Sequence, residues 1–346
     1  MELRSVRARA SLRLGLAGGG TDVSPYCDEY GGCVLNATID RYAYATLEPC
    51  SGDVVELIAA DQQYATMFPS GASIPDPLLS EVPLLAATYR RVMMDFNGGH
   101  PLPLRLTTFC DAPIGSGLGS SSTLVVAMLR AFSEWLKLAL DDYAIARLAW
   151  RIERVDCGFE GGRQDQYAAA FGGFNFMEFG ADERVLVTTL RIRPEIINEL
   201  EASLLLFSTG VSRESARIIA DQSQNVRSGA TTALEAMHGL RREALAMKEC
   251  LLRGDFEGIV QSMRQGWLNK KWSAASVSNQ RIDTVYEAAC ASGALAGKVS
   301  GAGGGGFMLF FVPPAQRMAV ARALGEFHGI VSNCHFTDRG AQAWRV

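Results

Sequence analysis

Several features that would define a protein class at once are absent from this sequence. It has only four histidines, and its eight cysteines include no CxxC pair and no histidine at metal-ligand spacing. Scattered cysteines of this kind are typical of core thiols in a reducing compartment and argue against a disulfide framework or a zinc site. Long apolar runs are also missing, and Arg13 interrupts the N-terminal stretch that could otherwise form a signal peptide. We therefore expect a cytoplasmic protein without a membrane span.

The sequence also lacks a large excess of positive or negative charge. Lys and Arg number 33 and Asp and Glu number 37, which gives a net charge of -4. So small a net charge, and of negative sign, argues against a nucleic-acid-binding surface. The expected partner is a small molecule. No internal repeat or low-complexity tract is present in the 346 residues, a length that favours two domains over a single core. The sequence leaves the oligomeric state open, a homo-oligomer included.

The Walker pattern GxxxxGK[ST] is missing too, yet a glycine-serine loop runs into an apolar helix at residues 111–129. Glycines let the backbone approach a ligand, and a helix N-terminus presents unpaired N–H groups and a partial positive charge. The loop therefore predicts a phosphate site that uses backbone N–H groups and serine hydroxyls, although an ordinary turn and helix cap has the same composition. The residues predicted to hold the phosphates are Gly115, Ser116, Gly117, Leu118, Gly119, Ser120, Ser121 and Ser122.

Two further glycine clusters lie near the ends of the chain. The first, AGGGTD at residues 17–22, ends a predicted strand over 3–16 that carries Arg13. Its Asp22 is either a carboxylate for a ligand or the cap of a turn. The second, KVSGAGGGGFMLFF at 298–311, contains GxGxxG but runs into an apolar strand, whereas a dinucleotide-binding turn requires a helix. We therefore exclude Rossmann binding and expect this loop to approach a bound phosphate or sugar.

Two acidic residues stand out between these clusters. Glu153 lies at the end of a predicted helix, where an acid is electrostatically unfavourable, so it either faces water or binds a cation. Asp165 lies in GGRQDQYAAAFGG, whose glycines and small apolar residues suit a tight, partly buried turn. A carboxylate in such a turn is a candidate general base.

The remaining pattern predicts a chain of mixed strands and helices. We expect strands over 34–47 and 54–58 in one antiparallel sheet, over 102–109, over 174–179 and 185–192 as a hairpin, over 204–207 and over 331–337. We expect helices over 84–95, after the central loop, and over 142–152, 194–202, 212–224, 231–253, 255–276, 282–292 and 315–328. Proline-rich residues 69–83 predict a loop that could fold over a site.

Three motifs, AGGGTD with the upstream Arg13, PIGSGLGSSS and KVSGAGGGGF, resemble the signatures of the galactokinase, homoserine kinase, mevalonate kinase and phosphomevalonate kinase (GHMP) superfamily. They occur in the superfamily's order, with QDQYAAAFGG between them, so the resemblance covers essentially the whole chain. Within the superfamily, residues 10–47 are most similar to the D-glycero-D-manno-heptose 7-phosphate kinases, with the fucokinase kinase domain as a near neighbour.

The resemblance implies an α+β two-domain GHMP kinase fold. An N-terminal domain like domain 2 of ribosomal protein S5 would span residues 1–190, and a C-terminal ferredoxin-like domain would span 191–346, with the active site between them. It also implies a reaction, the transfer of the γ-phosphoryl group of ATP to the anomeric O1 of heptose 7-phosphate on the route to GDP-heptose. The alternatives are a kinase of an unphosphorylated sugar such as fucose, and a non-catalytic sugar or nucleotide sensor.

Roles for individual residues follow from the same resemblance. It implies that Asp165 is the catalytic aspartate, that Arg13 assists it, and that Ser121 and Glu153 bind Mg²⁺ beside the ATP phosphates. Basic residues near or within the motifs are candidates for the phosphate of a sugar, with surface charge as the alternative for each. They are Lys270, Lys271, Arg281, Lys298, Arg41 and Arg163, of which Lys271 and Lys298 are favoured. The predicted substrate-binding residues are Gly19, Gly20, Thr21, Asp22, Gly162, Lys271, Lys298, Gly303 and Gly304.

Overall fold

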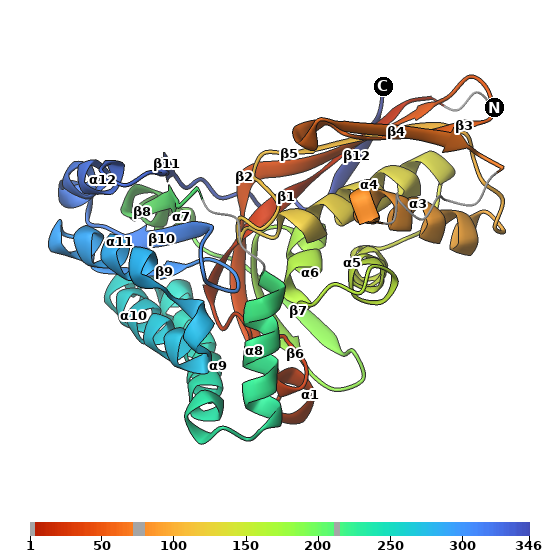
Figure 1. The fold of residues 1–346 in the computed structure, drawn as a ribbon. Coiled ribbons are helices and arrows are strands. Elements are labelled where there is room, and N and C mark those ends of the chain that lie inside the picture. The colour runs from red at the N-terminus through yellow and green to blue at the C-terminus, as the bar shows by residue number, and fades with distance from the viewer. Residues whose placement is uncertain (1–3, 72–79, 211–214) are drawn as a thin grey trace.

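A computed structural model describes residues 4–71, 80–210 and 215–346. The chain forms two lobes that meet along strands β1 (Val6–Ala17) and β2 (Gly32–Pro49), with the C-terminal lobe in green to blue in Figure 1. Residues 72–79 of the predicted proline-rich loop lie outside the described residues.

Eight strands of the described chain form the sheet of the N-terminal lobe. Their order is β12-β1-β2-β5-β3-β4, and the start of β2 also pairs with β6, which pairs with β7. β1 pairs with one edge of β2, and the other edge has two partners, because residues 43–49 pair with β5 and residues 32–37 pair with β6. The other strands are β3 (Val54–Ala59), β4 (Tyr64–Pro69), β5 (Leu104–Cys110), β6 (Phe174–Phe179), β7 (Val185–Leu190) and β12 (Gln342–Arg345).

Strand β1 is irregular where it carries Arg13. Its pairing with β2 shifts register between Ser11 and Arg13 and again between Gly15 and Ala17. Such bulges bend a strand and re-aim its side chains. The backbone N–H of Arg13 donates to Leu118 O (3.0 Å), so this part of β1 is bonded to the central glycine-serine loop as well as to β2.

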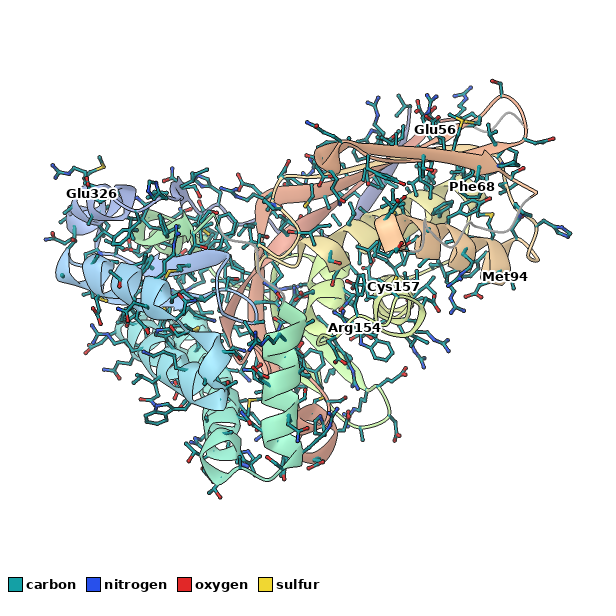
Figure 2. The ribbon with its side chains drawn as sticks, in the orientation of Figure 1. Glu56, Phe68, Met94, Arg154, Cys157 and Glu326 are labelled. Carbon is teal, nitrogen blue, oxygen red and sulfur yellow. The ribbon has the colours of Figure 1, made fainter. Side chains whose placement is uncertain are left out.

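Helices cover one face of this sheet (Figure 1). The periodic apolar residues of α4 (Ser120–Leu136) are buried in the same core cluster as β1 and β2, which α4 contacts. Figure 2 shows Phe68 of β4 on the covered side and Glu56 of β3 on the outer side. The other helices of this lobe are α1 (Tyr26–Tyr30), α3 (Pro83–Phe96), α5 (Asp142–Arg151) and α6 (Gln164–Phe171).

The C-terminal lobe, in its described part, has a four-stranded antiparallel sheet in the order β11-β8-β10-β9. β10 and all but the last residue of β8 are buried, as the apolar run at 204–207 predicts. The strands are β8 (Leu204–Ser208), β9 (Ala296–Val299), β10 (Phe307–Phe311) and β11 (Ile330–Asn333). The helices are α7 (Pro194–Ser203), α8 (Ser215–Arg227), α9 (Thr231–Arg253), α10 (Phe256–Ser273), α11 (Gln280–Ala291) and α12 (Arg317–Gly325).

The two lobes share a hydrophobic core. Leu12, Leu14 and Leu35 of the N-terminal sheet lie in one buried cluster with Leu206 and Leu309 of the C-terminal sheet. Separate clusters fill each lobe. Burial of apolar surface is the dominant favourable term in folding, so the junction is held as a packed core. Arg13 therefore sits on a strand that both lobes hold in place.

The predicted α+β fold with two lobes is confirmed, with differences in detail. The sequence analysis does not predict β4 or β12. It predicts an antiparallel sheet, but β3 pairs with β5 in parallel, so the sheet is mixed. β12 pairs with β1, which returns the end of the chain to the first sheet, whereas the predicted division at residue 190 assigns it to the second domain. Among the described residues, no helix has both the length and the apolarity of a membrane span.

Candidate active site

A cavity of about 540 Å³ lies where the two lobes meet. Its walls come from the central glycine-serine loop and the start of α4, from Arg13 of β1, from the start of α6, and from α8 and α10 of the C-terminal lobe. Segments far apart in the sequence therefore line one space, as is usual for a small-molecule site between lobes.

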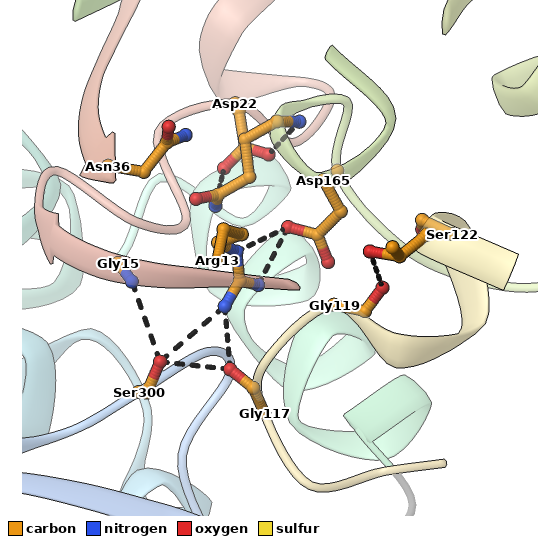
Figure 3. A network of polar contacts seen from close by, with 12 residues as sticks. Arg13, Gly15, Asp22, Asn36, Gly117, Gly119, Ser122, Asp165 and Ser300 are labelled. Atoms are coloured by element: carbon orange, nitrogen blue, oxygen red, sulfur yellow. Dashed lines mark hydrogen bonds and ion pairs between the residues drawn. The ribbon is translucent and has the colours of Figure 1, made fainter. Parts of the chain in front are cut away.

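Arg13 and Asp165, which both line this cavity, form an ion pair (Figure 3). Arg13 Nε donates to Asp165 Oδ1 (2.8 Å), Arg13 Nη2 lies 2.6 Å from the same oxygen, and Nη1 donates to Gly117 O (2.6 Å). The arginine side chain is 4% exposed and the aspartate side chain 23%. In the described part of the chain Asp165 Oδ2 has no hydrogen-bond partner, so this oxygen is available to a ligand.

The three serines at the start of α4 have different partners. Ser116 and Ser120 share a hydrogen bond between hydroxyls (3.0 Å), and Ser122 accepts one from Gln166 Nε2 (3.0 Å). Ser121 donates to Glu153 Oε1 (3.0 Å) and is the least buried of the three serines. Ser121 is thus the serine whose hydroxyl lies beside a carboxylate at the cavity wall.

Glu153 is buried because the helix that precedes it widens. After α5, residues Ile152–Asp156 form one turn of π-helix, closed by Cys157 N donating to Ile152 O (2.9 Å). Turns of this kind are frequent at functional sites because they change which way a side chain points. Glu153 is 1% exposed, with Ser121 and Gln166 donating to its two oxygens, so the solvent-facing alternative is wrong.

Asp22 acts as a remote cap for α6, the helix whose first turn carries Asp165. Its Oδ2 accepts the backbone N–H groups of Arg163 (3.0 Å) and Gln164 (3.1 Å). Its Oδ1 accepts from Gln164 Nε2 and from Gly20 N, each at 3.1 Å. Four donors on one buried carboxylate tie the first glycine cluster to the start of α6. The residue lines the cavity, and its hydrogen bonds support the capping alternative.

Two lysines of the C-terminal lobe donate to carbonyl oxygens at the end of β1 and in the first glycine cluster. Lys270 Nζ donates to Gly19 O (2.7 Å), and Lys298 Nζ donates to Gly15 O (2.6 Å) and Leu16 O (3.0 Å). Burial lowers the pKa of Lys270 to about 8. Burial, with the neighbouring charges of Lys270 and Arg13, lowers the pKa of Lys298 to about 7. Of the two, Lys270 lines the cavity.

Arg154 shapes another wall. Its guanidinium donates to the backbone oxygens of Phe159, Glu160 and Gly162 at 3.3–3.5 Å. Figure 2 places Arg154 on the side of the N-terminal lobe that faces the space between the lobes. The arginine holds the loop that leads into α6, so its charge is engaged by carbonyl groups.

The C-terminal glycine cluster packs against the central loop. A side chain at Gly117 would come within 2.3 Å of Ser300 O, and one at Gly306 within 2.2 Å of Ser116 O. Ser300 Oγ donates to Gly117 O (2.9 Å) and Phe307 N to Ser116 O (2.8 Å). Gly117 also has φ +82, a conformation that side chains rarely adopt. Bare backbone is therefore needed on both loops for the lobes to meet here.

Most of the predicted site residues line the cavity, and several do not. Lys271 lies outside the cavity wall, paired with Asp283 (3.6 Å). Thr21 is buried and bonded to backbone oxygens, and Gly303 and Gly304 lie against Val277. Lys270, which the sequence analysis names as a candidate without favouring it, lines the cavity. The lining residues that the sequence analysis does not name are chiefly Gln222, Gln164, Arg154, Ser215 and Ile219.

Only a weak signal in the sequence could have pointed to these residues. Gln164 and Gln166 alternate with Asp165 at the start of an otherwise apolar helix, a pattern that suggests a polar wall. Gln222 and Lys270 lie on amphipathic helices, where a polar residue facing a cavity has the same spacing as a polar residue facing water.

Comparison with known proteins places the chain in a family. Residues 84–173 match the model for the GHMP kinases N terminal domain, and residues 247–330 match the GHMP kinases C terminal model. The chain is 43% identical over 344 residues to the D-glycero-alpha-D-manno-heptose 7-phosphate kinase of Campylobacter jejuni, covering 99% of this chain and 100% of that protein. The chain belongs to the GHMP kinase family. As a member it is an ATP-dependent phosphotransferase, and the superfamily resemblance of the three motifs is confirmed.

The chain is also similar to a solved structure and to a second sugar kinase. The crystal structure of a D-glycero-D-manno-heptose 1-phosphate kinase from Bacteroides thetaiotaomicron has a TM-score of 0.83 and 42% identity, covering 99% of each chain. The L-fucokinase/L-fucose-1-P guanylyltransferase of Bacteroides fragilis is 27% identical over 90% of this chain and 35% of its own length.

The oxygens near Glu153 fit the Mg²⁺ ion that kinases of this kind use. Glu153 and Ser121 supply a carboxylate and a hydroxyl, and the buried Gln166 Oε1 beside them has no hydrogen-bond partner in the described structure. Within residues 4–71, 80–210 and 215–346, no group of three or more histidine, cysteine or acidic side chains could form a complete cage for a metal ion. Mg²⁺ keeps several waters and takes one or two carboxylates plus substrate phosphates, so a sparse oxygen set suits it.

Proposed function

We propose that this GHMP kinase transfers the γ-phosphoryl group of ATP to the anomeric O1 of D-glycero-D-manno-heptose 7-phosphate. The product would be the 1,7-bisphosphate, an intermediate for GDP-heptose biosynthesis. The observation that carries the proposal is the Arg13–Asp165 pair beside Gly117 O, set in a cavity between the lobes. The choice of sugar is supported by the 43% identity to the Campylobacter kinase over its whole length.

The central loop is the part of the cavity that would hold ATP. α4 begins after Gly119 without a side-chain cap, so the first N–H groups of the helix remain for a ligand. The partial positive charge of the helix N-terminus favours phosphate there. Ser121 and Glu153 would hold Mg²⁺, which supplies neutralisation of phosphate charge when it is bound.

Asp165 would orient the attacking hydroxyl and accept its proton. Arg13 bonds only to Oδ1, which leaves Oδ2 to receive the hydroxyl of the sugar. The guanidinium would lie close to where negative charge builds up during transfer. An anomeric hydroxyl is more acidic than an ordinary alcohol, so the carboxylate needs less basicity. Phosphoryl transfer depends mainly on positioning and charge neutralisation, which these residues can supply.

Release of ADP against a panel of acceptors tests the proposal. The panel contains heptose 7-phosphate, heptose 1-phosphate, mannose 6-phosphate, free heptose, fucose, galactose and mevalonate, each with ATP and Mg²⁺. We expect turnover with heptose 7-phosphate and a 1,7-bisphosphate product by phosphorus NMR. Turnover of free fucose alone, or of heptose 1-phosphate with the product carrying its new phosphate elsewhere, would overturn the substrate.

The compartment is also part of the proposal. All eight cysteines are free thiols, and burial raises the pKa of Cys27 to about 12, which keeps it protonated and unreactive. Free thiols suit the reducing cytoplasm, where ATP is available. Measurement of activity in cytosolic and envelope fractions of the producing cell tests this assignment.

A further inference from the structure

The ammonium group of Lys270 is a buried charge that the described protein does not neutralise. The residue is 5% exposed, and its Nζ has one hydrogen-bond partner in the described structure, Gly19 O at 2.7 Å. No carboxylate lies within ion-pair distance of it among the described residues. A buried charge without a counter-ion is costly, so it is retained where a ligand can pair with it.

The charged groups around Lys270 in the described part of the chain do not offer a counter-ion. Asp22 is the nearest source of negative charge, but four N–H donors already occupy its carboxylate. Arg13 and Lys298 add positive charge, and Arg13 is itself paired with Asp165. An anion that enters beside Lys270 therefore meets unbalanced positive charge.

Lys270 and Gln222 lie close against the bare backbone of Gly20 at the cavity wall. Gly20 has φ +105, and a side chain there would lie 2.9 Å from Lys270 Nζ and 3.5 Å from Gln222 Oε1. Gly20, Gln222 and Lys270 all line the cavity. Gln222 is held in place because its Nε2 donates to Ser273 Oγ (2.6 Å), and Ser273 Oγ donates to Lys270 O (2.7 Å).

We propose that Lys270, with Gln222 beside it over the bare backbone of Gly20, binds the phosphate that the sugar substrate already carries. This inference rests on the proposed function, because it takes a phosphorylated sugar as the acceptor. Among the basic candidates of the sequence analysis, it selects Lys270 over the favoured Lys271 and Lys298. Lys271 is paired with Asp283, and Lys298 donates to two carbonyl oxygens of β1.

The test compares phosphorylated and unphosphorylated sugars in matched variants. Lys270→Met should raise the KM for heptose 7-phosphate about 100-fold, the loss expected for a charge-assisted hydrogen bond in a buried site. The KM for ATP and the turnover of free heptose should change less than about threefold. Lys271→Met is the control, because the neighbouring lysine lies outside the cavity wall, and it should behave as wild type. Equal losses with both sugars, or a rise in the KM for ATP instead, overturn the proposal.

A second variant covers the case in which Lys270→Met does not fold. Gln222→Glu keeps the side-chain shape and places a carboxylate near Lys270, so it should also weaken the phosphorylated sugar about 100-fold by supplying an internal counter-ion and repelling phosphate. No selective effect on the phosphorylated sugar in Gln222→Glu contradicts the proposal.

Binding measurements separate this proposal from the proposed function. If the wild type does not phosphorylate any heptose phosphate, the proposed function fails, and calorimetry with mannose 6-phosphate and inorganic phosphate still tests Lys270. We expect the wild type to bind both anions and Lys270→Met to lose this binding. Binding that is equal in the two proteins, or absent from the wild type, overturns the assignment of Lys270.

Discussion

The cavity has two parts that treat charge in opposite ways. Around Asp165 and Glu153 each carboxylate has a donor from the protein, Arg13 in the first case and Ser121 with Gln166 in the second. Around Lys270 the charge has only a carbonyl oxygen among the described residues. Groups that are already paired are held in one geometry, which suits a step shared by a whole family. A charge left unpaired suits selection of one class of ligand.

The largest effect on activity is expected from removing the charge of Asp165, which pairs with Arg13. Asp165→Asn keeps the side-chain shape but removes the base, so kcat should fall about 1,000-fold, within the range for general-base groups. Calorimetry should show that affinity for ATP changes less than about threefold, because the nucleotide is held by the central loop. Asp283→Asn, outside the cavity wall, serves as the control. Unchanged turnover in Asp165→Asn would remove this residue from the mechanism.

Removing the cap of α6 should indirectly disturb the part of the cavity around Asp165. Asp22→Ala leaves the N–H groups of Arg163 and Gln164 without their acceptor, so the turn that carries Asp165 should shift. A displacement of about 1 Å at a catalytic group can cost about 100-fold in rate, so kcat should fall by about that factor while the KM for the sugar changes little. A loss confined to the KM for the sugar would instead show that Asp22 binds sugar hydroxyls directly.

Ser121→Ala should give a smaller loss that depends on metal concentration. The change removes the hydroxyl beside Glu153 and one proposed ligand of Mg²⁺, so the Mg²⁺ concentration for half-maximal rate should rise about tenfold. Ser133→Ala is a suitable control, because this serine lies near the other end of α4 and donates to Leu138 O. If the Mg²⁺ requirement is the same in both variants, Ser121 is not a metal ligand.

Binding of the phosphorylated sugar beside Lys270 should depend on pH. The pKa of Lys270 is lowered to about 8, chiefly by burial, with Asp22 opposing the shift and Arg13 adding to it. Above that pH the ammonium loses its proton, so the KM for heptose 7-phosphate should rise by up to about tenfold per pH unit. The KM for free heptose should stay level, and the rise should vanish in Lys270→Met. Parallel curves for the two sugars would assign the titration to another group.

The titration of Lys270 does not itself destabilise the fold as the pH rises. The pKa of Lys270 is lower in the folded chain than its ordinary value of 10.5, so the unfolded chain binds more protons between about pH 8 and 10.5. The contribution of Lys270 to stability therefore rises with pH across that window. Thermal unfolding measured at the same pH values checks that the protein remains folded.

Much of the fold is readable from local sequence. The apolar spacing after Gly119 predicts α4, and the run Leu204 to Phe207 predicts a buried strand, because both patterns follow from backbone geometry alone. β12 is different, since its four residues become a strand only by pairing with β1 at the other end of the chain. Elements that depend on a distant partner carry no comparable local signal.

The sequence by itself determined the family, the α+β fold, and the glycine-serine loop that leads into α4. Glycine positions, periodicity and motif order are local properties, and they survive in the linear chain. Only the tertiary structure decided that Asp22 caps α6, that Glu153 faces inward, and that Lys270 rather than Lys271 lines the cavity. The physical reason is that adjacent residues on a helix point in different directions, and the surroundings of a charged group are set by segments hundreds of residues away, as Gly19 is from Lys270.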